Sequence, residues 1–154
     1  QVQKLDAIVA SSIETAKPVA ASAGVTILAE LDEGVVVSGD AMRLGQACDN
    51  LISNAVKFTP QGGTITVRLS ESDGEATVEV HDTGLGIAAS DLEHLFSRFF
   101  RASTATKNAV PGVGLGLVIT KAIVVAHGGT LDVASEIGVG TNFTMALPLA
   151  KLRV

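Results

Sequence analysis

The sequence predicts an α/β (α+β) fold with two layers, in which helices cover one face of a mixed, mostly antiparallel sheet. Strand patterns occur in hairpin-like pairs with turn residues between their members, which favours antiparallel pairing. Strands and helices do not alternate strictly, as a doubly wound parallel sheet would require. The 154 residues are 47% hydrophobic and 18% charged, so they suit a single domain over 1–154 with one core.

The N-terminal half combines two helical patterns with short strand patterns. In order, we expect a strand over 1–4, a helix over 5–23, strands over 25–31 and 35–37, and a helix over 40–58. Pro18 should kink or divide the first helix, because proline lacks the amide donor. Asp32-Glu33-Gly34 is a turn signal between the two strands. Asp40 is a plausible N-cap for the second helix.

The C-terminal half begins with a hairpin, whose strands over 65–69 and 76–80 alternate apolar and polar residues. After it we expect a short helix over 90–96, a helix over 115–126, and strands over 130–133 and 142–147. Ser90 and Glu93 form a capping-box pattern for the short helix. The segment 102–111 is small, polar and without periodicity, which predicts a mobile loop.

Charge and composition exclude several kinds of partner. The formal net charge is −5 and no basic block occurs, so nucleic acid is not expected as a partner. No stretch is long and apolar enough to cross a bilayer, so we expect no membrane contact by this chain. The single cysteine, Cys48, cannot form an internal disulfide and is expected to be a buried thiol.

Four polar residues share one face of the helix expected over 40–58: Gln46, Asn50, Asn54 and Lys57. Apolar residues surround them, and buried amides require hydrogen-bond partners. The carbonyl oxygens of Asn50 and Asn54, one turn apart, are suitable hard ligands for Mg²⁺, and Lys57 is placed to meet a phosphate. The alternative, which spacing alone favours, is an ordinary amphipathic helix with a solvated polar face.

A second cluster, DTGLGI over 82–87, directly follows a predicted strand. Asp82 shares a face with the apolar residues of that strand, so its carboxylate should point towards the core or a pocket. An ionised carboxylate only accepts hydrogen bonds and therefore suits an exocyclic amine such as N6 of adenine. Gly84 and Gly86 would let the backbone approach a flat base. A structural turn capped by Asp82 is an equally good alternative.

Two further clusters flank the loop over 102–111. In FSRFFR, over 96–101, Arg101 stands at the loop hinge and can swing onto a transferring phosphate, whereas packing at a domain edge is expected for the aromatic residues. GVGLGL, over 112–117, opens a helix whose exposed amides would bind phosphate. It is neither a dinucleotide fingerprint nor a P-loop, because its third spaced glycine is replaced by Leu117 and no Gly-Lys-Ser/Thr follows. Close helix packing is the alternative for this turn.

Taken in order, these clusters resemble the sequence boxes of sensor histidine kinases. QACDNLISNAVKFTP resembles the N box of that family, DTGLGI its G1 box, LFSRFFR its F box, GVGLGL its G2 box and GVGTNFTMALP its closing G3 segment. The resemblance extends from Leu5 to Pro148, and the boxes together are highly specific. It implies the Bergerat-type two-layer sandwich that gyrase, Hsp90 and MutL share.

The resemblance implies binding of Mg-ATP and assigns roles by position. Asn50 and Asn54 should serve Mg²⁺ and Lys57 the phosphates. Asp82 should bind N6 of adenine and Arg101 should contact the γ-phosphate, while the loop before the G2 box should act as an ATP lid. The other residues expected to border the nucleotide are Phe58, Gly84, Gly86, Ile87, Phe100, Gly112, Val113, Gly114, Leu115 and Thr141. Val113 stands where the family often has threonine, so a hydroxyl is missing there.

The resemblance also implies that the γ-phosphoryl group is transferred to a histidine in two-component signalling. ATPase relatives place a glutamate one turn before the metal-binding asparagine. This chain has Asn50 there, so ATP hydrolysis should be poor. Transfer needs positioning and charge neutralisation, and a neutral imidazole is already nucleophilic. We therefore expect a protein-histidine kinase catalytic domain, a transferase, with Asn50 and Arg101 as its catalytic residues.

The acceptor histidine is expected outside this chain, because His81, His94 and His127 do not fit the family's acceptor motif and are interpreted as structural. The expected partners are an upstream dimerisation domain of the same kinase, which carries the phosphoacceptor histidine, and the receiver domain of a response regulator. The expected location is cytoplasmic, and the chain alone should bind ATP without autophosphorylation.

Two alternatives to a histidine kinase remain. The first is a non-catalytic nucleotide-binding or interaction module, which would not need Lys57 and Arg101. The second is a serine kinase of the anti-sigma type. The intact F box and G3 segment count against this second alternative.

Overall fold

The computed structural model describes residues 1–92 and 113–150 of the chain. In chain order its elements are β1 (Val2–Lys4), α1 (Leu5–Ser22), β2 (Thr26–Leu31), β3 (Val36–Ser38), α2 (Ala41–Phe58), β4 (Thr64–Ser72), β5 (Glu75–Asp82), α3 (Ala89–Leu92), α5 (Val113–Ala126), β6 (Thr130–Glu136) and β7 (Gly140–Pro148). α3 begins at Ala89, so Ser90 lies inside this helix. Glu93, the expected partner of Ser90, and the loop predicted over 102–111 lie outside the described residues.

A five-stranded sheet in the order β2-β4-β5-β7-β6 forms one layer of the molecule. β2 and β4 are parallel, whereas all other neighbours in this sheet are antiparallel. β1 and β3 form a separate antiparallel pair. The sheet is therefore mixed and mostly antiparallel, and the predicted fold class is confirmed.

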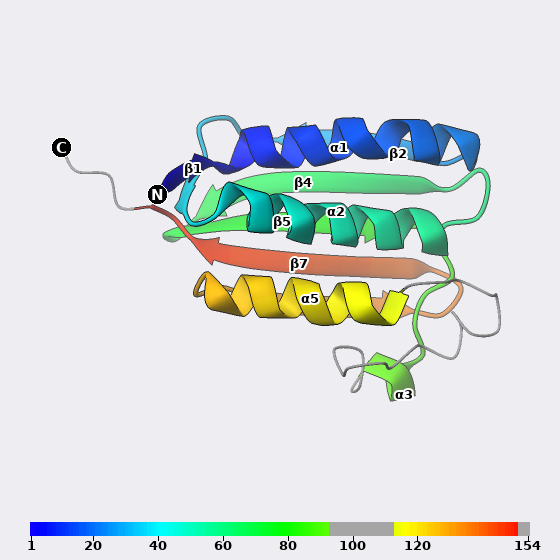
Figure 1. The fold of residues 1–154 in the computed structure, drawn as a ribbon. Coiled ribbons are helices and arrows are strands. Elements are labelled where there is room, and N and C mark those ends of the chain that lie inside the picture. The colour runs from blue at the N-terminus through cyan, green and yellow to red at the C-terminus, as the bar shows by residue number, and fades with distance from the viewer. Residues whose placement is uncertain (93–112, 151–154) are drawn as a thin grey trace.

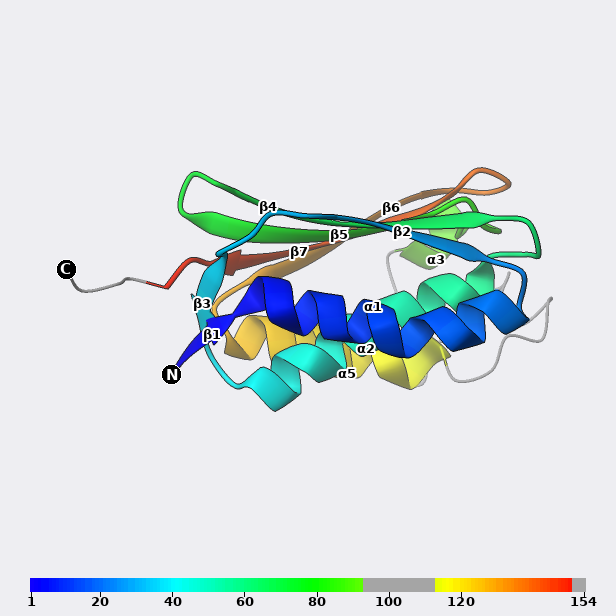
Figure 2. The ribbon, with the colours of Figure 1, turned by 90° about the horizontal axis from the view of Figure 1, so that it is seen from above.

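Three helices, α1, α2 and α5, cover one face of this sheet (Figure 1), and the edge-on view shows the two layers clearly (Figure 2). Alternate residues of β4 and β5 point into the space between the layers, so they are buried while their neighbours are not. The helices contribute their apolar stripes to the same core. Its largest fully buried side chains are Leu5, Val9, Leu44, Leu51, Ile52, Ile65, Leu69, Leu117, Leu131, Met145 and Leu147.

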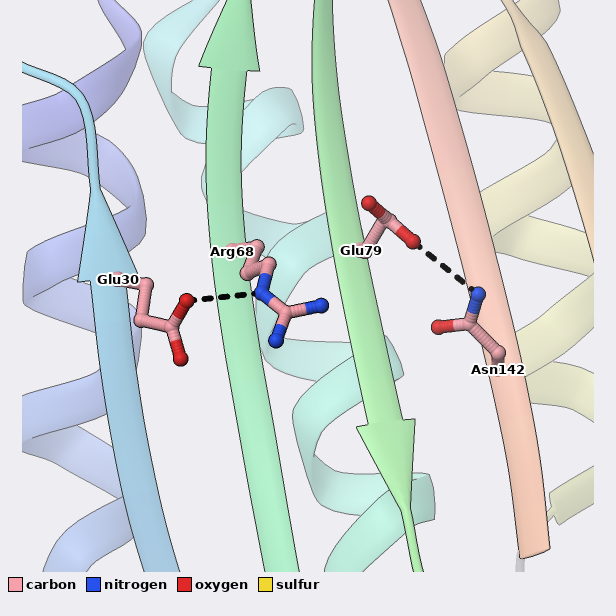
Figure 3. Close-up of polar contacts among 4 residues, drawn as sticks. All are labelled: Glu30, Arg68, Glu79 and Asn142. Atoms are coloured by element: carbon pink, nitrogen blue, oxygen red, sulfur yellow. Dashed lines mark hydrogen bonds and ion pairs between the residues drawn. The ribbon is translucent and has the colours of Figure 1, made fainter.

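The opposite face of the sheet carries polar side chains that bond to one another across the strands (Figure 3). Arg68 Nε donates to Glu30 Oε1 at 2.9 Å, which links β4 to β2. Asn142 Nδ2 donates to Glu79 Oε2 at 3.2 Å, which links β7 to β5. Such a solvated face needs no second layer of helices, in keeping with a two-layer fold.

The ends of α2 and α5 are joined by side chains. The carboxylate of Asp40 accepts hydrogen bonds from the Met42 and Arg43 amides, so this residue is the N-cap of α2, as predicted. The Asp40 amide donates to Nε2 of His127, and Nδ1 of the same ring bonds to the Ile123 carbonyl. His127 therefore has a structural role, as the sequence analysis expected.

One local expectation about the N-terminal half, a kink or a division at Pro18, is narrowed, and another was wrong. α1 continues through Pro18, so this proline does not divide the helix; it is exposed, and the lost hydrogen bond lies on the side away from the core. β2 and β3 do not pair as a hairpin. Residues after the turn are held by the start of α1, where the Leu5 amide donates to the Val35 carbonyl and the Gly34 amide to Asp6 Oδ2. These contacts direct β3 towards β1.

Cys48 is buried on α2, as predicted. Desolvation, with a smaller contribution from Asp49, raises the pKa of this thiol to about 12. A thiol that stays protonated is a poor nucleophile and a poor metal ligand. Cys48 therefore acts as a small core residue.

Candidate nucleotide-binding site

Three polar side chains lie in one row across neighbouring strands. Asp82 at the end of β5 is paired with Thr141 of β7, which is itself paired with Ser135 of β6. Side chains of directly paired residues point to the same face of a sheet. Asp82 is only 2% exposed and Thr141 only 3%, so this is the face that the helices cover. The row is therefore a buried polar surface beneath an otherwise apolar layer.

The carboxylate of Asp82 is held by backbone amides. Its Oδ1 accepts from the Gly84 amide at 2.9 Å, and the Thr141 amide is a second donor to this side chain. The structural interpretation, a turn capped by Asp82, is thus correct for this oxygen, but a carboxylate has further acceptor sites. Burial raises the pKa of Asp82, against the opposing effects of the two amides and of His81. A buried acceptor of this kind suits a ligand that brings its own donor.

The glycines of the loop after β5 are required by contacts within the protein. A side chain at Gly84 would collide with the carbonyl oxygen of Phe58, and one at Gly86 with that of Glu136. Gly86 also has a φ of +76°, a conformation that L side chains rarely adopt. Glycine at these two positions therefore lets the loop pack against α2 on one side and β6 on the other. The expected approach of a flat base to the same glycines stays a prediction.

The same loop is anchored by hydrogen bonds at three points. The Leu85 amide donates to the Phe58 carbonyl at 3.1 Å, at the end of α2. The Leu85 carbonyl accepts from the Gly138 amide at 3.0 Å, in the turn between β6 and β7. The Ile87 amide donates to the hydroxyl of Ser135 at 2.7 Å. A loop fixed in this way presents a preformed surface.

The two asparagines of α2 lie on its side that faces α5. Asn50 is half-buried, and its Nδ2 donates to the Gly116 carbonyl of α5 at 3.3 Å. Asn54 is 4% exposed, and its Nδ2 has no hydrogen-bond partner in the described part of the chain. The solvated-face interpretation of this helix is therefore wrong for Asn54. A buried amide without a partner costs about 1–3 kcal/mol, which a bound ligand or water would recover.

Lys57 and Phe58 have different surroundings from these asparagines. Lys57 is exposed and borders a groove of about 280 Å³ between α1 and α2, beside Asp49 and Ser53. Phe58 is buried in the core, and its carbonyl anchors the loop after β5. No described contact joins either side chain to Asn54, so their roles towards a nucleotide stay predictions.

The remaining predicted site residues lie before or at the start of α5 in the sequence. Phe100, Arg101 and Gly112 lie outside the described residues, as does His94. α5 begins at Val113 and includes Gly114 and Leu115, so the expected helix N-terminus is present. The Gly116 carbonyl, in the first turn of α5, accepts the hydrogen bond from Asn50. The N-terminus of α5 therefore lies next to Asn50 on α2.

Two residues beside the predicted ones were not found from the sequence. Ser135 bonds to Ile87 and Thr141, and Thr120 donates to the same Gly116 carbonyl that Asn50 contacts. The contact of Ser135 with Ile87 joins segments that no local pattern relates, whereas the Thr120 bond is the i−4 contact that threonine commonly makes within a helix. The signal that was present for Ser135 is its position at the end of a strand just before the glycine-rich turn of GVGTNFTMALP. In residues 1–92 and 113–150, no group of three or more His, Cys, Asp or Glu side chains is placed to hold a metal ion.

The chain matches known proteins over most of its length. Residues 39–151 match the family model described as "Histidine kinase-, DNA gyrase B-, and HSP90-like ATPase". The chain is 37% identical over 144 residues to the sensor-like histidine kinase SenX3 of Mycobacterium tuberculosis. This match covers 94% of this chain and 35% of SenX3. It is 36% identical to the sensor histidine kinase RppB of Synechocystis sp., over 94% of this chain and 32% of RppB. The chain thus spans about a third of the length of these curated relatives.

Solved structures give the same result. The mycobacterial sensor histidine kinase MprB superposes with a TM-score of 0.86 at 29% identity, and the match covers 99% of this chain and all of that one. Full-length ShkA, solved in complex with AMPPNP, superposes with a TM-score of 0.83 at 28% identity. This match covers the whole of this chain and 32% of ShkA.

No described helix is long and apolar enough to cross a membrane. The fold, the order of the boxes and the family match agree with one another. The chain belongs to the histidine kinase-, DNA gyrase B- and HSP90-like ATPase family, and it is an ATP-binding domain of the kind found in sensor histidine kinases.

Proposed function

We propose that this chain, as one domain, binds Mg-ATP, and that its parent protein transfers the γ-phosphoryl group to a histidine on a separate dimerisation domain. The observation that carries the proposal is Asp82. It is a buried carboxylate next to a loop fixed by three hydrogen bonds, in a chain that belongs to an ATPase family. An acceptor of this kind complements the 6-amino group of adenine.

The residues of α2 fit a hard cation. The side-chain oxygens of Asn50 and Asn54 accept no hydrogen bond from any described residue. The unpartnered Nδ2 of Asn54 is a donor, so it suits a phosphate oxygen or water and not the cation. Amide oxygens are ligands that Mg²⁺ accepts, usually together with phosphate oxygens and water. Mg²⁺ bound there would neutralise charge on the phosphates. Asn50 and Asn54 would hold it, and Asn50 would keep its donor bond to α5.

The surroundings of Asn50 favour transfer over hydrolysis. Hydrolysis needs a group that activates water, and an amide is not a general base. The neighbouring carboxylate, Asp49, borders the groove between α1 and α2, whereas Asn50 bonds to α5 on the other side of the helix. Arg101, Gly112 and the amides at the start of α5 complete the phosphate side of the proposal. An imidazole acceptor needs only correct placement against the γ-phosphate.

The proposed partners follow from this chemistry. The first is the dimerisation domain of the same kinase, which supplies the acceptor histidine, and the second is the receiver domain of a response regulator. Both would be met in the cytoplasm, where ATP is available. The described histidines are not candidates for the acceptor, since His127 is fixed between α2 and α5 and His81 lies within β5 on the far side of the sheet from the helices.

Titration calorimetry with ATP and Mg²⁺ tests the binding site. The wild-type chain should bind, Asp82→Ala should lose most of the affinity, and Asn54→Ala should lose the part that depends on Mg²⁺. Arg68→Ala, on the opposite face of the sheet, is the control and should bind as the wild type does. Unchanged affinity in both site variants would contradict the assignment.

Addition of a dimerisation domain and radiolabelled ATP tests the transfer. We expect an acid-labile label on that domain and none on this chain. An acid-stable label would indicate a serine kinase, and ATP binding without any label would indicate a non-catalytic module.

A further inference from the structure

The hydroxyl of Ser135 contacts three polar groups at once. The Ile87 amide lies 2.7 Å from its oxygen, the Gly140 carbonyl 2.9 Å, and the hydroxyl of Thr141 2.8 Å. These partners belong to the loop after β5 and to the start of β7. Ser135 on β6 is therefore the point where the two segments that flank Asp82 are joined.

The chemistry of the three partners fixes the direction of each hydrogen bond. An amide N–H can only donate and a carbonyl can only accept, so Ser135 accepts from Ile87 and its single proton goes to the Gly140 carbonyl. The third contact must then use the proton of Thr141. With its proton directed at Ser135, Thr141 Oγ1 offers only lone pairs to other groups.

The two most buried side chains of the row are then both acceptors. Asp82 and Thr141 are paired across β5 and β7, and neither offers a proton to the space beneath the helices when Asp82 is ionised. A 6-amino purine brings donors to this position. The oxygen at position 6 of a 6-oxo purine is an acceptor, and this oxygen would face two acceptors.

We infer that Ser135 is a positioning residue that sets the hydrogen-bonding direction of the base pocket and so favours 6-amino over 6-oxo purine nucleotides. This inference rests on the proposed binding of ATP. Ser135 acts through Thr141 and Ile87 and does not itself touch the base. Loss of its hydroxyl frees the Thr141 proton to rotate towards the ligand and releases the Ile87 amide.

The experiment compares the dissociation constants of ATP and ITP for the wild type, Ser135→Ala and Ser135→Thr. In Ser135→Ala the ATP affinity should fall roughly three- to tenfold, and the preference for ATP over ITP should narrow by a similar factor, because one hydrogen-bonded group changes direction. Ser135→Thr keeps the hydroxyl and should restore both values to within about twofold. Ser70→Ala, an exposed serine on β4, is the matched control and should change neither value.

Amide hydrogen exchange at Ile87 gives a second, local readout. Protection of this amide should fall in Ser135→Ala and be retained in Ser135→Thr. If Ser135→Ala does not fold, Ser135→Cys, which keeps the size but is a weak acceptor, should show the same narrowed preference.

An unchanged ATP-to-ITP preference in the folded variant would overturn the inference, as would an equal loss in Ser135→Thr. Failure of the wild-type chain to bind any nucleotide would instead contradict the proposed function. The two failures are therefore distinguishable.

Discussion

The two ends of the candidate site differ in how completely the protein satisfies its own polar groups. At the base end, which comprises Asp82, the loop 83–87, Thr141 and Ser135, carboxylate, hydroxyls and amides bond to one another. At the phosphate end, which comprises Asn50, Asn54 and the start of α5, a buried amide nitrogen has no partner among the described residues. The base end is thus complete without ligand, and the phosphate end is not.

This difference indicates how the free energy of binding is divided. A preformed surface loses little conformational entropy when a base binds, so recognition of the base should depend on fixed geometry. The unsatisfied N–H donor of Asn54 gains a partner only when an acceptor, such as a phosphate oxygen or water, arrives. Changes that break the internal contacts of the base end should therefore disturb folding and binding together, whereas changes at the phosphate end should disturb binding alone.

Gly86→Ala should give the largest effect on stability. The added methyl group must enter the left-handed region and would collide with the Glu136 carbonyl. We expect the free energy of unfolding to fall by about 3 kcal/mol, with a matching loss of ATP affinity. Urea denaturation and calorimetry measure the two quantities.

Gly74→Ala is the matched control for this change. Gly74 has a similar φ of +80°, but an added Cβ meets no atom within 4 Å. It should lose only the conformational part, about 1 kcal/mol, and should bind ATP normally. Equal destabilisation of the two variants would show that the contact between the loop and β6 contributes nothing.

Asp82→Asn should separate binding from folding within the base end. The raised pKa of Asp82 means that burial favours its neutral form. The stability that the protonated Asp82 carboxyl contributes to the folded state is fully present below its ordinary pKa of 3.8. This stability is lost as pH rises through the higher pKa that Asp82 has in the folded state. The asparagine variant should therefore gain stability relative to the wild type as pH rises, while its ATP affinity falls roughly 10- to 100-fold.

Denaturation of both proteins over about pH 4 to pH 8, beside titrations with ATP at neutral pH, measures these effects. If the wild type instead becomes more stable relative to Asp82→Asn as pH rises, the pKa of Asp82 is not raised in the folded state. Retained ATP affinity in Asp82→Asn would show that the base is recognised elsewhere.

Local patterns predicted most of the helices and strands. The N-cap of α2 at Asp40 and the alternation of Ile65, Val67 and Leu69 are set by neighbouring residues, so one sequence is enough to find them. The same holds for Asp82, whose burial follows from its place on the inward face of β5.

Contacts between distant segments were not predictable in this way. Nothing near Asn50 indicates the Gly116 carbonyl, which lies 66 residues later. The collision that requires glycine at position 86 involves the backbone of β6, a contact with a distant segment that the local sequence does not indicate. The separate courses of β2 and β3 likewise depend on contacts with α1 that the turn residues do not encode.

Asn54→Ala should give the smallest effect on folding and so provides the sharpest test of the phosphate end. The substitution removes a buried Nδ2 that has no partner, so the lost packing is offset by relief of the unsatisfied group, and the free energy of unfolding should change by less than about 1 kcal/mol. Thr59→Ala, at the end of the same helix, removes a satisfied hydroxyl that donates to the Ala55 carbonyl at 2.7 Å and should cost about 1 kcal/mol. The effects of the two variants on Mg-ATP affinity should have the opposite order. Asn54→Ala should bind Mg-ATP roughly tenfold more weakly, and Thr59→Ala should bind it as the wild type does. If Asn54→Ala proves the less stable of the two and binds Mg-ATP as the wild type does, Asn54 is a structural residue and the phosphate end must lie elsewhere.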